Sequence, residues 1–133
     1  MRLHHVGIVV DNIKKSNEYM NNIFDYEKSE ILTNLTQKVN YCFLGSSQTK
    51  IELIEPTSDD SPIANFLKNN GNGLHHIAFE VDDIETSITK LTSNGGKLIS
   101  KPSIGFENRT IAFIFSHSSP VQLIELVSKK LVE

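Results

Sequence analysis

Residues 74–84 read LHHIAFEVDDI, and residues 3–13 read LHHVGIVVDNI. At an offset of 71 residues, the two segments share the leucine, both histidines, the last valine, the first aspartate and the final isoleucine. A second match follows further along, because IEL at 51–53 recurs at 124–126. Such self-similarity is typical of a duplicated structural unit. The sequence therefore predicts two copies of one module, each with a histidine early and a glutamate late.

Length and composition limit the class of protein. A chain of 133 residues with 38% hydrophobic and 22% charged residues is long enough for one globular domain with a real core. The 13 Lys and Arg residues are outnumbered by 16 Asp and Glu residues, without a clustered basic stretch. This balance argues against nucleic acid as a partner and leaves a small molecule as the expected ligand.

The single cysteine and the first residues indicate the compartment. Cys42 is the only cysteine, so it forms no internal disulfide, and its place in a strand-like run favours a small buried hydrophobic residue over a nucleophile. The chain begins with a strand pattern and not with the charged, apolar and small-residue regions of an export signal. We therefore expect a cytoplasmic protein without a membrane partner.

The sequence pattern of each copy predicts secondary structure elements in the order strand, helix, strand, strand, strand. Asp11 is expected to cap a helix over 12–24, and Asp82 or Asp83 a helix that stops at Asn94. Strands are predicted at 3–10, 27–32, 37–44, 50–54, 97–100, 109–115 and 121–127, with a turn at 45–47. The first strand of the second copy is predicted to begin at Leu74, in the stretch that matches 3–10.

The predicted fold class is α+β. Two tandem βαβββ modules, about 1–56 and about 74–127, are expected to form a curved, half-open, barrel-like sheet around a metal cleft, all within one domain. Residues 57–73 are the expected linker, with a short helix that Ser61 caps and that starts at Pro62.

Strand alternation separates the paired histidines. His5 shares a face with Gly7, and His76 shares one with Ala78, whereas His4 and His75 point to the opposite, aliphatic side. Gly7 is expected to keep the face of His5 open. Each histidine alone is best interpreted as a hydrogen-bonded strand residue. Their repetition favours His5 and His76 as ligands.

The repeat predicts a metal site. Pseudo-twofold symmetry would bring together two histidines of the first strands and two glutamates of the last strands, namely His5, Glu52, His76 and Glu125. Two imidazoles and two carboxylates suit one divalent transition metal, such as Zn, Ni, Co or Mn, and leave coordination positions open to substrate. Open positions are typical of a catalytic site.

With these residues, the sequence resembles proteins of the vicinal-oxygen-chelate superfamily over nearly the whole chain. The stretches DSPIANFL at 60–67 and GLHHIAFEVDDI at 73–84 are most similar to methylmalonyl-CoA epimerases. The resemblance implies that His5, His76 and Glu125 are metal ligands and that Glu52 fills a fourth position. It also implies a homodimer. Tyr41 departs from the pattern, because many bacterial epimerases have a catalytic glutamate there, and 113–117 departs from the family's FLHPK segment.

The resemblance implies chemistry in which a metal chelates a carbonyl and a proton moves through an enediolate. Glu125 is the expected base, Glu52 its candidate partner, Tyr41 a further candidate, and Glu80 a weaker one. An epimerase acting on an α-carbonyl or thioester substrate is the first interpretation. The four ligands also resemble those of glyoxalase I (lactoylglutathione lyase). A non-catalytic, drug-sequestering protein is the third interpretation.

Overall fold

A computed structural model describes residues 1–45 and 49–131 of the chain. Its residues divide into two compact units. The N-terminal unit comprises His5–His75, and the C-terminal unit comprises Met1–His4 together with His76–Glu133. The turn predicted at 45–47 lies, apart from Gly45, outside the described residues.

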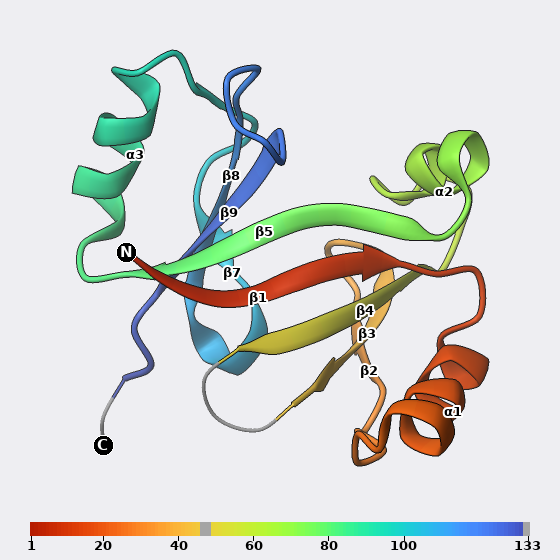
Figure 1. Cartoon of the computed structure of the whole chain (residues 1–133). Helices are drawn as coiled ribbons and strands as arrows, with labels where there is room; N and C mark the ends of the chain where they lie inside the picture. The colour runs from red at the N-terminus through yellow and green to blue at the C-terminus, as the bar shows by residue number, and fades with distance from the viewer. Residues whose placement is uncertain (46–48, 132–133) are drawn as a thin grey trace. The chain divides into compact units, whose positions relative to one another are not determined.

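In the part of the N-terminal unit that the structure describes, four strands lie in the order β2-β3-β4-β1 and are accompanied by two helices (Figure 1). β1 pairs in parallel with β4, and the other neighbours are antiparallel. The elements are β1 (Arg2–Val9, whose first residues belong to the other unit), α1 (Ile13–Phe24), β2 (Leu32–Asn34), β3 (Val39–Leu44), β4 (Lys50–Pro56) and α2 (Ala64–Asn70).

Helix α1 covers one face of this sheet. Ile13 and Met20 of the helix pack with Cys42 and Leu53 of the strands. The N-cap is Asn12 and not the expected Asp11, because the Asn12 side chain accepts a hydrogen bond from the Lys15 amide at 3.0 Å. Glu55 of β4 adds a long-range cap, since its carboxylate accepts from the Ile13 amide at 2.9 Å. Two side chains thus satisfy amides that the first helical turn leaves without partners.

The linker contains the expected helix with a later start. Helix α2 begins at Ala64, and the cap position, Ile63, makes no side-chain hydrogen bond, so the prediction of Ser61 as cap and Pro62 as first residue is wrong. Ser61 is buried instead, with its hydroxyl directed at the Gln37 carbonyl at 3.5 Å. Ile63 and Phe66 pack with Val9 and Ile54 on the sheet face opposite α1.

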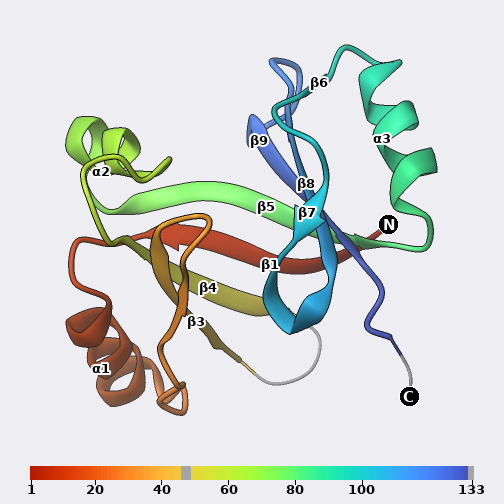
Figure 2. The same ribbon diagram turned by 180° about the vertical axis from the view of Figure 1, so that it is seen from behind.

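The C-terminal unit has its strands in the order β5-β9-β8-β6, with β7 also paired to β8 (Figure 2). β5 and β9 are parallel, and β8 is antiparallel to its neighbours. The elements are β5 (Gly73–Val81, whose first residues belong to the other unit), α3 (Ile84–Thr92), β6 (Lys97–Leu98), β7 (Ser103–Ile104), the short 3-10 helix η1 (Phe106–Asn108), β8 (Thr110–Phe115) and β9 (Leu123–Ser128).

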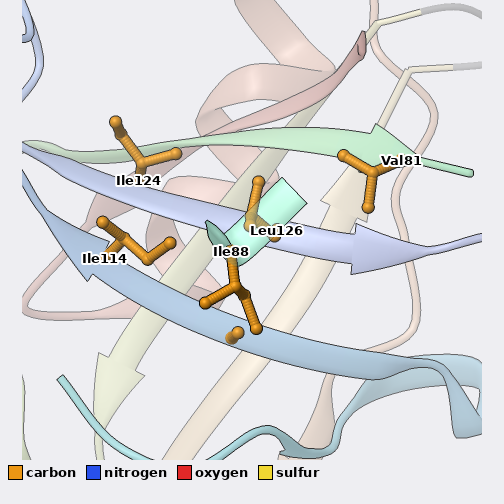
Figure 3. Packing of buried hydrophobic residues seen from close by; sticks show 6 residues of the cluster. Val81, Ile88, Ile114, Ile124 and Leu126 are labelled. Carbon is orange, nitrogen blue, oxygen red and sulfur yellow. The ribbon is translucent and has the colours of Figure 1, made fainter. Parts of the chain in front are cut away.

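Helix α3 packs on this second sheet. Ile88 of the helix lies against Ile114 and Leu126 of β8 and β9 (Figure 3), and these three belong to one buried cluster. Asp83 is the N-cap, through a 3.0 Å hydrogen bond from the Thr86 amide, so one of the two predicted caps is confirmed. Both units therefore place a capped helix on one sheet face, as the repeat predicts.

One predicted strand is largely absent. Of the segment 27–32, only Leu32 is in a strand, since β2 covers Leu32–Asn34. The reason is Asn17 of α1, whose buried amide donates to the Ser29 carbonyl at 2.9 Å and accepts from the Ser29 amide at 3.4 Å. A side chain thus takes the backbone groups that a strand would have used. Strand β7 and η1 were not predicted.

The prediction of an α+β fold with a βαβββ order in each copy is confirmed, with β7 as an addition in the second copy. Among the helices of residues 1–45 and 49–131, none is long and apolar enough to cross a lipid bilayer. The single-domain organisation with modules at about 1–56 and 74–127, and the cytoplasmic location, stay predictions.

Candidate metal centre

In the N-terminal unit, the sheet register brings His5 to Glu52. Gly7 of β1 and Phe43 of β3 are both register partners of Glu52 on β4. The side chains of Glu52, Phe43 and His5, which is two residues before Gly7, therefore share one sheet face. The His5 Nε2 atom lies 3.4 Å from Glu52 Oε1. His5 is 0% exposed and Glu52 9% exposed. A buried imidazole and a buried carboxylate therefore form a close pair.

The C-terminal unit repeats this pair. Ala78 of β5 and Phe113 of β8 are the register partners of Glu125 on β9, and His76 lies two residues before Ala78. The His76 Nε2 atom lies 3.2 Å from Glu125 Oε1, with exposures of 2% for the histidine and 3% for the glutamate. The duplicated sequence thus gives the same local geometry twice.

The other two histidines belong to the opposite sheet face. His4 and His75 are half-buried, whereas His5 and His76 are buried, so the predicted alternation is confirmed. The His4 ring packs on Phe106 with ring centroids 5.3 Å apart, and the His75 ring packs on Phe66 at 5.0 Å. The face of His5 differs from the expectation, because Gly7 and Val9 are buried and the packing of Ile63 with Val9 covers part of that face.

Two phenylalanines next to the histidines were missed by sequence reasoning. The Phe43 ring lies edge-on to His5 at 5.1 Å with an interplanar angle of 73°, and the Phe113 ring lies edge-on to His76 at 5.8 Å and 87°. The signal was the register of the two hairpins, which pairs each phenylalanine with a glutamate ligand candidate. That register depends on turn geometry, which alternation alone does not give.

Tyr41 lies on the same sheet face as Glu52. It is two residues from Phe43 on β3, and the two rings are 6.0 Å apart in an edge-on arrangement. Its ring also packs against the cluster of Val39, Ile54 and Ile63 and is half-buried. Tyr41 therefore has a packing role in the N-terminal unit, and its catalytic role stays a prediction.

Glu80, the weakest base candidate, is held by two arginines. Its carboxylate is 2.7 Å from Nη1 of the buried Arg109 and also binds Arg2. Burial raises the pKa of Glu80, but the hydrogen bond from Arg109 and the charges of both arginines outweigh it and hold the pKa below its ordinary value. A carboxylate so engaged is a poor base, and Glu80 is a salt-bridged residue of β5.

Cys42 faces α1 and not the histidine–glutamate pairs. It is 1% exposed within the cluster that includes Leu53. Burial, and then the negative charge of Glu52, raises the pKa of the thiol to about 11. The thiolate is therefore negligible at neutral pH, and the prediction that Cys42 is a packed hydrophobic residue and not a nucleophile agrees with this environment.

The atoms of each pair suit a metal ion. Two ligand atoms that bind one ion at about 2.1 Å each are about 3.0 to 3.4 Å apart for bond angles between octahedral and tetrahedral. The two measured separations, 3.4 Å in the N-terminal unit and 3.2 Å in the C-terminal unit, lie in this range. All four side chains are among the residues able to hold a metal ion. Nitrogen and oxygen donors of this kind fit Zn, Ni, Co and Mn.

Comparison with known proteins gives consistent matches. The family model for the glyoxalase/bleomycin resistance protein/dioxygenase superfamily matches residues 4–113. The mitochondrial methylmalonyl-CoA epimerase of Dictyostelium discoideum is 37% identical over 130 residues, covering 96% of this chain and 78% of that protein.

Solved structures agree with this match. A crystal structure of methylmalonyl-CoA epimerase from Mycobacterium tuberculosis has a TM-score of 0.86 at 29% identity, covering 96% of this chain and 87% of that one. A Streptomyces coelicolor methylmalonyl-CoA epimerase in complex with 2-nitronate-propionyl-CoA has a TM-score of 0.88 at 26% identity, covering 98% and 99%. These similarities confirm the vicinal-oxygen-chelate fold. The relatives are enzymes, which confirms the prediction that this chain is one.

Proposed function

This chain belongs to the glyoxalase/bleomycin resistance protein/dioxygenase superfamily, and from that membership we propose that it is a metal-dependent epimerase of a methylmalonyl-CoA-type thioester. Its similarity to methylmalonyl-CoA epimerases over almost its whole length supports the substrate class. The observation that carries the chemistry is the buried His–Glu pair found in each unit, His5–Glu52 and His76–Glu125.

We propose that the two pairs together hold one divalent transition metal. Burying an ionised carboxylate costs several kcal/mol unless a cation neighbours it, and a metal would supply that charge to both Glu52 and Glu125. As a Lewis acid, the metal would polarise the thioester carbonyl and make the neighbouring C–H bond more acidic. The choice among Zn, Ni, Co and Mn is left to metal analysis.

The chain's own residues would move the proton. In the proposed reaction a Glu125 carboxylate oxygen takes the α-proton, and the electrons of the C–H bond pass to the thioester oxygen to give an enolate. A second group then returns a proton to the opposite face of the same carbon, which inverts the centre. Glu52 and Tyr41 are the candidates for that group. The low exposure of Glu125, 3%, would limit competition from water.

Deuterium exchange tests the proposed function. The purified, metal-analysed protein is incubated in D2O with methylmalonyl-CoA, and the α-proton is followed by NMR. We expect exchange and inversion that a chelator stops and added metal restores. Absence of exchange with metal-loaded protein would refute the proposal.

The same assay separates the alternatives. Exchange only with the hemithioacetal of methylglyoxal and glutathione would favour lactoylglutathione lyase chemistry. Tight ligand binding without any exchange would favour a sequestering protein.

Tyr41→Phe is expected to keep the fold and the metal but to lower turnover at least tenfold, which corresponds to about 1.4 kcal/mol of transition-state stabilisation. A phenol with a pKa of about 10 is a poor base, yet its hydroxyl can donate a proton or hydrogen bond to a developing enolate. The measurement is the exchange rate at saturating substrate, beside circular dichroism and metal content.

An unchanged rate in Tyr41→Phe would leave Tyr41 as a packing residue against Phe43 and Ile54. Tyr41→Glu provides the complementary test, because it restores the residue that many bacterial epimerases have there. A rise in methylmalonyl-CoA epimerisation from a negligible level would indicate that the natural substrate differs.

A homodimer is expected in solution. The family resemblance and the open-edged βαβββ modules support this proposal, since unpaired strand edges favour association. Light scattering at micromolar protein concentration measures the mass directly. A measured mass of 14.9 kDa, that of the monomer, would contradict the prediction.

A further inference from the structure

Each histidine of the proposed metal site has a phenylalanine edge-on to its ring. Phe43 of β3 and His5 of β1 lie on either side of β4 in the N-terminal unit, and Phe113 of β8 and His76 of β5 lie on either side of β9 in the C-terminal unit. The two phenylalanines occupy equivalent places, because each is the register partner of the glutamate that pairs with the histidine. The repeat therefore preserves three side chains and not two, namely histidine, glutamate and phenylalanine.

A metal-binding imidazole must be held in one ring orientation, and a packed aromatic ring is one group that can hold it. The χ2 torsion of histidine is broad and roughly two-fold, so a histidine without packing partners turns its ring and exchanges the places of its two nitrogens. In both units the Nε2 atom is directed at the glutamate, at 3.4 and 3.2 Å. A flat ring packed at 73° or 87° to the imidazole plane restricts rotation away from this orientation.

We propose that Phe43 and Phe113 are positioning residues, which hold the imidazoles of His5 and His76 with Nε2 directed into the metal site. This inference rests on the proposed function, because it assumes that both histidines bind the metal. The ring also adds apolar surface beside the donor atom, which strengthens the interaction of ligand and cation by lowering the local dielectric. Neither phenylalanine contacts the reacting atoms in this proposal.

The chain contains a matched control. Phe66 packs edge-on against His75 at 5.0 Å and 88°, in nearly the same geometry, but His75 lies on the opposite sheet face and is not a proposed ligand. Replacing Phe66 therefore removes the same kind of contact at a place that the proposal does not connect to metal. If loss of any Phe–His contact weakened metal binding, replacement of Phe66 would weaken it as much as replacement of Phe43 or Phe113.

The experiment measures Co²⁺ binding to the purified, metal-free protein. Phe43→Leu and Phe113→Leu are each expected to raise the dissociation constant about tenfold, the lower end of the range for groups that orient metal ligands. Phe66→Leu is expected to leave it unchanged. Phe43→Tyr and Phe113→Tyr keep a flat ring and should bind as the wild type does. The visible Co²⁺ absorption spectrum should also change in the leucine variants only.

Melting temperatures of the metal-free variants separate positioning from folding. The proposal is supported if Phe43→Leu and Phe66→Leu lower the melting temperature by similar amounts, but only Phe43→Leu weakens Co²⁺ binding. Methionine, a flexible residue without a flat ring, replaces leucine in any variant that does not fold. If the folded Phe43 and Phe113 variants have the same Co²⁺ affinity and absorption spectrum as the wild type, the positioning proposal is overturned. Failure of the wild type to bind Co²⁺ would instead refute the metal site itself, and this proposal with it.

Discussion

His76→Ala is expected to abolish tight metal binding, whereas His75→Ala should leave the metal content unchanged. The two residues are adjacent, but strand alternation puts them on opposite faces, and His76 pairs with Glu125 while His75 packs on Phe66. Loss of one ligand of four should weaken binding by more than about 100-fold, beyond what orienting groups contribute. Elemental analysis after dialysis against a metal buffer gives the stoichiometry.

Stability provides a second readout for these two variants. A metal that binds only the folded chain stabilises it by about 2.7 kcal/mol at a free concentration 100 times its dissociation constant. Added metal should therefore raise the melting temperature of the wild type and of His75→Ala, but not that of His76→Ala. His75→Ala itself should lose about 1 kcal/mol, since it removes the ring contact with Phe66. If added metal instead stabilises His76→Ala and not His75→Ala, the assignment of the His76 face to metal binding and of the His75 face to packing is wrong.

Glu125→Gln is expected to lower the rate of α-proton exchange by about 10² to 10⁴, the range for loss of a general base. The amide has nearly the shape of the carboxylate and retains an oxygen that binds metal, so fold and metal content should largely remain. Exchange of methylmalonyl-CoA in D2O, with the metal content measured on the same sample, separates loss of the base from loss of the ion.

Glu80→Gln is the control for this prediction. Glu80 lies on the same sheet face as His76, but its carboxylate is bound to Arg109 at 2.7 Å, so its replacement should lower stability and change exchange only a few-fold. A large loss in Glu80→Gln together with little loss in Glu125→Gln would transfer the role of base to Glu80. Little loss in either variant would leave Glu52 and Tyr41 as the groups to test.

The repeat in the sequence was enough to predict much of the fold and the candidate ligands. Local patterns determine which face of a strand a side chain belongs to, and a strand has a period of two, so the separation of His5 from His4 follows from spacing alone. The two histidines and the two glutamates recur at corresponding places of the two copies, and this repetition indicated a metal site that no single residue could indicate. The α+β order of elements followed from the same periodicities, with errors at element ends.

Other features depend on groups far apart in the sequence, and only the tertiary structure decided them. Glu55 reaches the start of α1 and caps a further amide, and Asn17 takes the backbone groups of Ser29, so a predicted strand is largely absent. Glu80 is a salt-bridged residue because Arg109, between η1 and β8, lies beside it.

The partners of the histidines are the clearest case. Nothing local in the sequence connects Phe43 to His5 or Phe113 to His76, because the register of a sheet is set by turns and by packing between strands. The sequence by itself determined which histidines share a face with a glutamate. The pairing of strands determined which atoms are within 3.4 Å of one another and which rings pack beside the histidines.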